Sequence, residues 1–360
     1  MVQPVNGGSA TRDDLGAREW IIDDELTHLR EWGTHRLHPL PASGEEITIG
    51  AAEGCALRLI DPDRRVSREH ARLHREPSGW VIRDLGSTNG TRIDGAKRPL
   101  FPLAPGAEVG IGSLTLIAES RALLALRDFL ARLLGWSADR TAVIDRAVRA
   151  LRTAAARRGA LLVCGKGDLV PIARSLHART LGEERPFVVC DPRRRSSAAS
   201  VRAAKSLREG LPALEAAAGG TMCVRTRRLP RDFREVSLAI HDPAARVQLV
   251  VCTDDTDDAR TLLANPIAIP PLVRRRAELG RIIDEYARDA VASLAAGVTG
   301  FTTSDHDWVV EHGASSLPEI EKSTRRLVAI RQTSSLAQAA VRLGMSHVAL
   351  AQWIGRRRLP

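Results

Sequence analysis

The feature that most constrains the fold of this chain is a pair of polar segments, Ser67–His70 and Asp84–Thr91, set between short alternating apolar runs. These runs are Ile47–Ile49, Ala71–Leu73, Trp80–Ile82 and Val109–Ile111. Short alternating runs with Gly and Asn at the turns predict a small all-β domain. Ser67, Thr88 and Asn89 would then lie on loops at one end of the strands. Hydroxyl and amide groups on such loops suit the binding of a phosphate and a peptide backbone.

Both segments resemble those of a forkhead-associated (FHA) domain, a reader of phosphothreonine peptides. The resemblance covers roughly residues 32–119 and implies an all-β sandwich. It also implies that Ser67 bonds the phosphate and that Thr88 and Asn89 hold the peptide and the loop. His70 would support the phosphate loop from below without touching the ligand.

One position departs from the FHA pattern. The family follows the glycine of an early strand with an arginine that clamps the phosphate, but here Gly50 is followed by Ala51. Alanine cannot replace the bidentate guanidinium. Arg64, Arg65 or Arg68 could supply the charge from the neighbouring loop, so a phosphopeptide reader and an FHA fold kept only for protein contacts both stay open. The candidate phosphopeptide-binding residues are Ser67, Arg68, Thr88, Asn89 and Arg65.

The length and composition point to a multidomain basic protein. A chain of 360 residues can hold two or three domains, and its net charge of +10 favours an anionic partner. No apolar run approaches the roughly 18 residues of a membrane helix. Residues 1–31, taken as an N-terminal extension, lack the regions of a signal peptide, so we expect a cytoplasmic protein with no membrane partner.

The five cysteines form no Cys-x-x-Cys pair. Four of them lie in or beside predicted strands, where small buried fillers are favoured over a metal site at a sheet edge. We expect neither a metal nor a cofactor.

Residues 120–158 form a predicted helical linker with two helices, Glu119–Leu134 and Ser137–Arg158. Apolar residues recur at helical spacing in both. Burial against the next domain is the default interpretation, and a dimerising coil is the alternative.

Residues 159–272 are predicted to form an α/β domain. Apolar strands at Ala160–Cys164, Phe187–Cys190, Thr221–Val224 and Gln248–Cys252 favour a parallel sheet covered on both faces. The order of these strands and their flanking segments resembles the AAA+ domain of bacterial sigma-54-dependent enhancer-binding transcription activators; an unrelated α/β domain is the alternative.

The chemistry of an ATPase is missing from this domain. A phosphate loop needs Gly-x-x-x-x-Gly-Lys-Ser/Thr, whereas Gly165–Asp168 is too short. Arg225 and Thr226 stand where the resemblance places the magnesium-binding acids. The run Arg193–Arg195 lies where those activators carry the loop that contacts their sigma factor. We therefore expect a degenerate, catalytically inactive domain and no enzyme.

The C-terminal part is predicted to be all-α. Residues 273–331 resemble the helical lid of the same activators, with Pro318 in place of a nucleotide-sensing arginine. Residues 332–360 resemble a Fis-type helix-turn-helix, with Gly344 at the turn and Ser346 as the cap of the second helix. Eight basic and two acidic residues lie between Glu319 and Pro360, as phosphate contacts require. The candidate DNA-binding residues are Ser346, His347, Ala349, Gln352, Arg356, Arg357 and Arg358, and a plain three-helix bundle is the alternative.

Taken together, these patterns favour a bacterial transcription regulator. It would bind a phosphothreonine protein of a Ser/Thr kinase pathway through its FHA module and DNA through its C-terminus, as a homodimer. The competing hypothesis is a signalling adaptor that docks phosphothreonine proteins and does not bind DNA.

Overall fold

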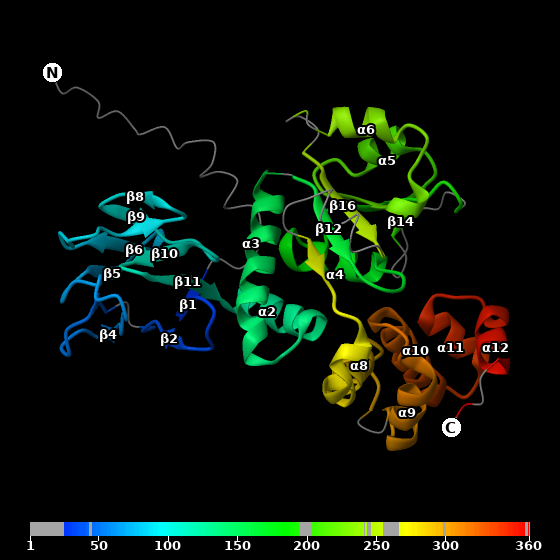
Figure 1. The fold of residues 1–360 in the computed structure, drawn as a ribbon. Helices are drawn as coiled ribbons and strands as arrows, with labels where there is room; N and C mark the ends of the chain where they lie inside the picture. Colours follow the sequence, from blue (N-terminus) through cyan, green and yellow to red (C-terminus); the bar gives the residue numbers. More distant parts are fainter. Residues whose placement is uncertain are drawn as a thin grey trace. The chain divides into compact units, whose positions relative to one another are not determined.

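The computed structural model describes residues 25–42, 45–157, 159–194, 204–240, 242, 246–254, 266–297, 300–356 and 359 (Figure 1). The chain divides into two compact units. The first comprises Met1–Ala131, Ser137–Gly159 and Ala178–Gly182, and the second comprises Arg132–Trp136, Ala160–His177 and Glu183–Pro360.

A β-sandwich forms most of the first unit. One sheet has six strands in the order β2-β1-β11-β10-β7-β8, and the other has five in the order β4-β3-β5-β6-β9. The strands are β1 Leu26–Glu31, β2 Leu37–Pro39, β3 Ile47–Gly50, β4 Leu57–Arg58, β5 Ala71–Glu76, β6 Gly79–Asp84, β7 Arg92–Ile93, β8 Ala96–Lys97, β9 Leu100–Pro102, β10 Glu108–Ile111 and β11 Leu114–Ser120.

The apolar residues of the alternating runs that predicted these strands are buried in the sandwich. Ile47 and Ile49 on β3 and Leu73 on β5 are buried, because alternate residues of a strand face the same side. Antiparallel pairing of β1 with β11 places Leu26 opposite Ser120. The sandwich therefore starts at Leu26, inside the segment 1–31 that the sequence assigned to an extension.

The predicted linker, residues 120–158, forms helix α2 Arg121–Leu134, the turn η1 Ala138–Arg140 and helix α3 Thr141–Arg157. Ser137 precedes η1 without a side-chain cap bond, so the long helix starts at Thr141. Arg152 on α3 pairs with Asp94 of the sandwich at 2.8 Å. The helix α3 is thus tied to the β-sandwich within the first unit.

A second link between helices and sandwich is fully buried. Arg30 on β1 pairs with Glu119 on β11 at 2.7 Å and also with Asp145 on α3. Arg127 on α2 pairs with the same two carboxylates. Two cations and two anions therefore balance each other in the interior of the first unit, which a buried ionic cluster requires.

An all-parallel sheet forms the centre of the second unit, with the strand order β14-β13-β15-β16-β12-β17. This confirms the predicted parallel sheet. Its strands are β12 Leu161–Cys164, β13 Phe187–Cys190, β14 Lys205–Leu207, β15 Thr221–Arg225, β16 Gln248–Thr253 and β17 Ile267–Ala268. Helices α5 Gly210–Ala216 and α6 Phe233–Ala239 pack on one face, opposite α4 Val170–Thr180 (Figure 1), and η2 Thr226–Arg228 follows β15.

The remaining elements are helical and confirm the predicted all-α C-terminal part. They are η3 Leu272–Glu278, α8 Leu279–Ser293, α9 Thr303–Trp308, the π-helical turn η5 Val309–Gly313, α10 Leu317–Arg331, α11 Leu336–Leu343 and α12 His347–Gly355. Ser316 caps α10 by accepting the Glu319 N–H, so the helix begins close to the predicted position. Among the described residues, no helix is long and apolar enough to cross a membrane.

All five cysteines are buried and free of disulfides. The Cys223 and Cys252 sulfurs lie 3.8 Å apart on neighbouring strands β15 and β16. The hydrogen bond with the neighbouring Cys252 thiol and burial raise the pKa of Cys223, which keeps the Cys223 sulfur in the thiol form.

Candidate functional site

Two loops of the sandwich meet at the polar segments singled out in the sequence. One joins β4 to β5 and carries Ser67; the other joins β6 to β7 and carries Thr88 and Asn89. The Ser67 hydroxyl oxygen accepts the Thr88 N–H at 3.1 Å. The Asn89 side-chain amide donates to the Arg65 carbonyl at 2.8 Å. The structure thus brings four of the five predicted phosphopeptide residues into one hydrogen-bonded group.

His70 supports this group from below, as the resemblance implies. Its imidazole is fully buried, and its Nδ1 accepts the Ser67 N–H at 3.1 Å. Burial lowers the pKa of His70, so the ring is neutral near pH 7 and can accept this hydrogen bond. His70 fixes the backbone of Ser67 and does not take part in the exposed surface.

Asp84 organises the second loop, a role that the sequence analysis did not assign. Its carboxylate accepts from the N–H and hydroxyl groups of both Ser87 and Thr91 at 2.7 to 2.9 Å. Although burial raises the pKa of Asp84, these hydrogen bonds lower it below the usual value overall. The ionised carboxylate therefore shapes the turn that presents Thr88 and Asn89.

Asp61 organises the β4–β5 loop, which carries Ser67, in the same way. Its carboxylate accepts the Arg65 N–H at 2.9 Å and bonds to the Ser113 hydroxyl. Asx-type bonding of this kind holds a turn in place. Arg64, two residues before Val66, adopts a positive φ of 54° within this turn.

The cationic side chains available to a phosphate come from this loop. Arg64, Arg65 and Arg68 are all exposed. Ala51 donates its N–H to the Ser67 carbonyl at 3.0 Å, and its methyl group packs against the sandwich core. Arg65 also borders a surface cavity of about 450 Å³ that Arg92 and Ser113 line with it.

A family model for the FHA domain matches residues 47–112. Residues 47–112 are an FHA domain. This chain is 44% identical over 69 residues to the FHA domain-containing protein FhaB of Mycolicibacterium smegmatis, a match covering 19% of this chain and 43% of that protein. FhaB of Mycobacterium tuberculosis is 42% identical over 71 residues, covering 19% and 44%. The chain thus spans less than half the length of these curated relatives.

Among solved structures, the FHA part is similar to one from a study of phosphothreonine-dependent FHA domain interactions. The two are 28% identical with a TM-score of 0.24, and the match covers 26% of this chain and 95% of that one.

The predicted helix-turn-helix residues lie on α11, α12 and the turn between them. Gly344 adopts the left-handed conformation, with φ of 64°, that a residue with a side chain rarely takes. Ser346 caps α12 by accepting the Ala349 N–H. Both features agree with the sequence prediction.

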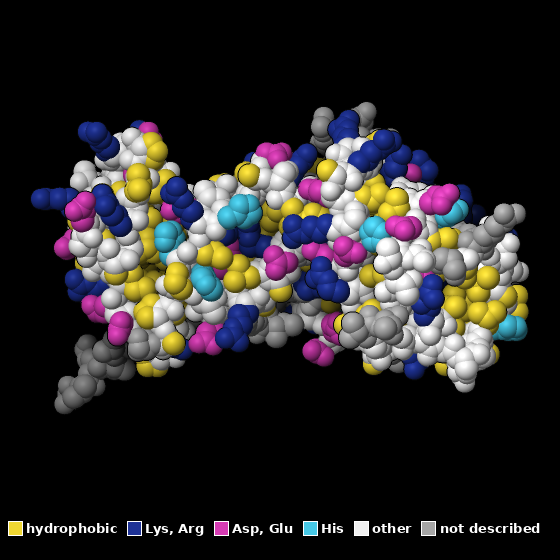
Figure 2. All heavy atoms as spheres, turned by 90° about the horizontal axis from the view of Figure 1, so that it is seen from below, with side chains coloured by type: hydrophobic (Ala, Val, Ile, Leu, Met, Phe, Trp, Pro, Cys, Tyr) yellow, Lys and Arg dark blue, Asp and Glu magenta, His cyan; other side chains and the backbone are white. Residues whose placement is uncertain are grey.

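On α12, His347, Ala349 and Gln352 are exposed, as is Arg356 directly after it, whereas Leu350 and Trp353 are buried. Arg357 and Arg358 lie outside the described residues. Val348 is 53% exposed, so this apolar side chain lies on the outer face of α12 and not in the small core. Apolar side chains also show at this end of the second unit in the space-filling view (Figure 2).

The AAA+ resemblance implies a magnesium-dependent nucleotide site at the carboxyl ends of the central strands. At the end of β15, Arg225 pairs with Asp168 at 2.8 Å and with Asp191 at 3.0 Å. Arg228 also pairs with Asp191 at 3.1 Å, so guanidinium groups already occupy both carboxylates and this donor set does not fit a magnesium ion.

Proposed function

We propose that the FHA domain binds phosphothreonine peptides at the loops that carry Ser67 and Asn89. The observation that carries this proposal is the Ser67 hydroxyl, which accepts the Thr88 N–H and keeps its own hydrogen for a phosphate oxygen. The loop backbone is held by His70 and Asp84, so little ordering entropy is lost on binding.

The charge for the phosphate comes from the loop of residues 61–70 in this proposal. Arg65 and Arg68 flank Ser67 and are exposed, whereas Ala51 has no charge to offer. Guanidinium groups bind a dianionic phosphate through paired N–H donors. A partner that carries phosphothreonine, such as a substrate of a Ser/Thr kinase pathway, fits this chemistry.

Fluorescence anisotropy with a phosphothreonine peptide selected from a degenerate library tests this site. A charge-assisted hydrogen bond contributes about 1.5–3 kcal/mol, so Ser67→Ala should weaken binding by about 10- to 150-fold. Arg68→Ala should also weaken it. Ser78→Ala, in the exposed β5–β6 turn, is the matched control and should bind as the wild type does. Equal affinity of Ser67→Ala and wild type would refute this placement.

We propose further that α11 and α12 bind DNA and that the whole chain acts as a transcription regulator, as a homodimer. The left-handed Gly344 turn, the capped second helix and the exposed face of His347 and Gln352 support this proposal. The basic residues Arg356, Arg357 and Arg358 would meet the phosphate backbone.

DNA binding is tested with the full chain by anisotropy on recovered genomic fragments across a salt series. Replacement of Arg356, Arg357 and Arg358 by alanine should weaken binding. It should also reduce the slope of log affinity against log salt concentration by up to the contribution of about three phosphate contacts. Sedimentation of the complex reports whether two copies bind one palindrome. Weak binding that is equal on every sequence would contradict a regulator.

A signalling adaptor is the second candidate, and a specific observation favours it. Val341 is 76% exposed and Val348 is 53% exposed, so the C-terminal helices carry an apolar surface that DNA does not need. An adaptor would keep phosphothreonine binding and show no saturable DNA binding.

We propose no catalytic activity for the central domain. The Arg225 pairs with Asp168 and Asp191 support this proposal, since magnesium-assisted phosphoryl transfer needs free carboxylates. A phosphate-release assay with ATP and magnesium should give no turnover above that of heat-denatured protein.

A further inference from the structure

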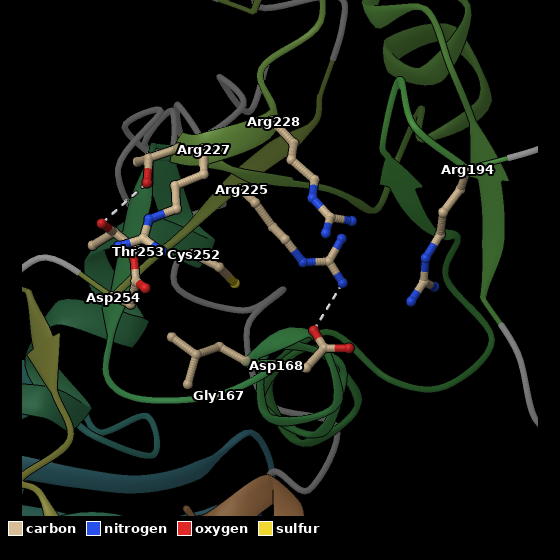
Figure 3. Close-up of a pocket in the computed structure, with 11 residues that line it drawn as sticks. Gly167, Asp168, Arg194, Arg225, Arg227, Arg228, Cys252, Thr253 and Asp254 are labelled. Atoms are coloured by element: carbon tan, nitrogen blue, oxygen red, sulfur yellow. Dashed lines mark hydrogen bonds and ion pairs between the residues drawn. The ribbon is translucent and has the colours of Figure 1, made fainter. Parts of the chain in front are cut away.

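A cavity of about 310 Å³ opens at the carboxyl ends of four parallel strands in the second unit (Figure 3). The strands β12, β13, β15 and β16 lead into its walls. Ligands of open parallel sheets bind at this edge, and the volume lies at the small end of the usual range for ligand pockets. The charged residues that line it are Asp168, Arg194, Arg225, Arg227, Arg228 and Asp254.

Asp191 gathers three of the arginines around this cavity. Its carboxylate is fully buried and lies 3.0 Å from Arg225 and 3.1 Å from Arg228. The Arg194 Nε lies 3.8 Å from the same oxygen, beyond hydrogen-bond length. One buried negative charge therefore orients three positive charges toward the same space.

The other two carboxylates balance the cluster only in part. Asp168 pairs with Arg225 at 2.8 Å, and Asp254 pairs with Arg227 at 2.9 Å. Within the described part of the cavity wall, four guanidinium groups thus face the carboxylates of Asp168 and Asp254, and the buried Asp191 lies behind them. Among these described residues, positive charge is in excess at a site partly screened from water, where electrostatic interactions are strong.

Unused donors point to the ligand. Arg228 reaches Asp191 through one nitrogen, and the Arg194 side chain makes only the longer contact among the described residues. A guanidinium carries five N–H donors in a planar fork that matches phosphate oxygens. In Figure 3, the guanidinium groups of Arg225 and Arg228 extend into the space above Asp168, and that of Arg194 lies to the right of this space.

We propose that this cavity binds the phosphate or pyrophosphate group of a small molecule without a divalent metal. The arginines supply the charge that a metal ion would supply elsewhere. The net positive wall repels Mg²⁺, and Asp168 and Asp191 are already paired. The site is separate from the phosphothreonine site of the FHA domain, since every lining residue belongs to the second unit.

Titration calorimetry of the full chain with inorganic pyrophosphate, at constant ionic strength, tests the proposal. The Ser67→Ala background removes a contribution from the FHA site, and saturable binding to one site per chain is expected. Added Mg²⁺ should weaken the apparent affinity, because it binds pyrophosphate in solution. Where a metal completes the site, Mg²⁺ would instead be required, and that result would overturn the proposal.

A double variant tests the residues. Arg194 and Arg228 have exposed fractions of 54% and 39%, so Arg194→Ala with Arg228→Ala leaves the Arg225–Asp191 pair in place. The variant should lose at least about tenfold in affinity at an unchanged Tm, while Arg231→Ala, an exposed arginine outside the cavity, should not. Undiminished binding by the double variant, or no binding by the parent, would overturn the proposal.

ATP without metal separates the two possible sources of the bound phosphate group. An affinity for ATP above that for pyrophosphate identifies a nucleotide, and equal affinity identifies recognition of the phosphate group alone.

Discussion

Replacement of Asp145 by alanine should destabilise the first unit severely. Asp145 lies on α3 and its carboxylate is fully buried. It pairs with Arg30 and Arg127, and it accepts the Gly33 N–H at 2.7 Å. Its removal leaves two buried guanidinium groups facing Glu119 alone, with one backbone donor unsatisfied.

The expected size of the effect follows from that geometry. Breaking a buried ion pair by removing one partner costs about 3–5 kcal/mol, which is a large part of the roughly 5–15 kcal/mol that stabilises a domain. For a unit of about 150 residues, this corresponds to a decrease in Tm of roughly 6–20 °C. Asp139→Ala, which removes an exposed carboxylate paired with Arg140, should leave the Tm unchanged.

Urea unfolding of the full chain measures the change, and hydrogen exchange assigns it to the first unit. The double variant Asp145→Ala, Arg127→Met should recover part of the lost stability, because one of the two unbalanced charges is removed with it. A loss below about 1 kcal/mol for Asp145→Ala, or a double variant less stable than the single one, would refute the argument that charge balance holds α3 on the sandwich.

Three further predictions concern single residues. Gly50→Ala would bring a Cβ to 2.1 Å from the Arg68 carbonyl oxygen, so it should shift the loop that carries Ser67. It should lower the free energy of unfolding in urea by about 1–3 kcal/mol and weaken phosphopeptide binding. Gly54→Ala, whose Cβ would meet no atom within 4 Å, should have none of these effects. Burial lowers the pKa of His70, so below pH 6.5 the unfolded chain binds more protons than the folded chain. The free energy of unfolding should therefore fall as pH decreases below 6.5, by up to about 1.4 kcal/mol per pH unit. For His70→Asn, the free energy of unfolding from urea titrations should change less steeply with pH. Gly344→Ala should cost about 1–2 kcal/mol of local stability by hydrogen exchange on α11 and α12, because φ is 64° there, while Gly355→Ala should be neutral.

Local patterns predicted the elements that local physics determines. The alternation around Ile49 and Leu73 identified sandwich strands, and the small apolar runs ending at Cys164 and Cys190 identified parallel ones. Gly344 could be placed because a tight turn between two helices demands a left-handed residue.

Long-range pairs could not be predicted in the same way. Arg30 and Asp145 are 115 residues apart, and nothing in the surrounding sequence of either one indicates the other. The roles of Asp84 and Asp61 depend on where neighbouring loops place their N–H donors. A search for acidic residues that precede loop serines and threonines would have found Asp84, since such residues commonly bond their own turn.

The position of an apolar residue on a short helix was equally hard to predict. Val348 is apolar but 53% exposed, whereas Leu350 and Trp353 are buried, and Trp353 contacts Trp308 and Arg326 on neighbouring helices. A nine-residue helix has room for few inward positions, so one-residue differences in its rotation decide which side chain is exposed.

The central claim is that the loops around Ser67 recognise phosphothreonine although Ala51 replaces the expected arginine. The most direct measurement compares the affinity of the full chain for a degenerate phosphothreonine peptide library with its affinity for the same library carrying unmodified threonine. Saturable binding of the phosphorylated library, at least about tenfold tighter than that of the unmodified one, is the predicted result. Equal binding of the two libraries would contradict the claim and would leave the FHA domain as a fold for protein contacts that do not depend on phosphate.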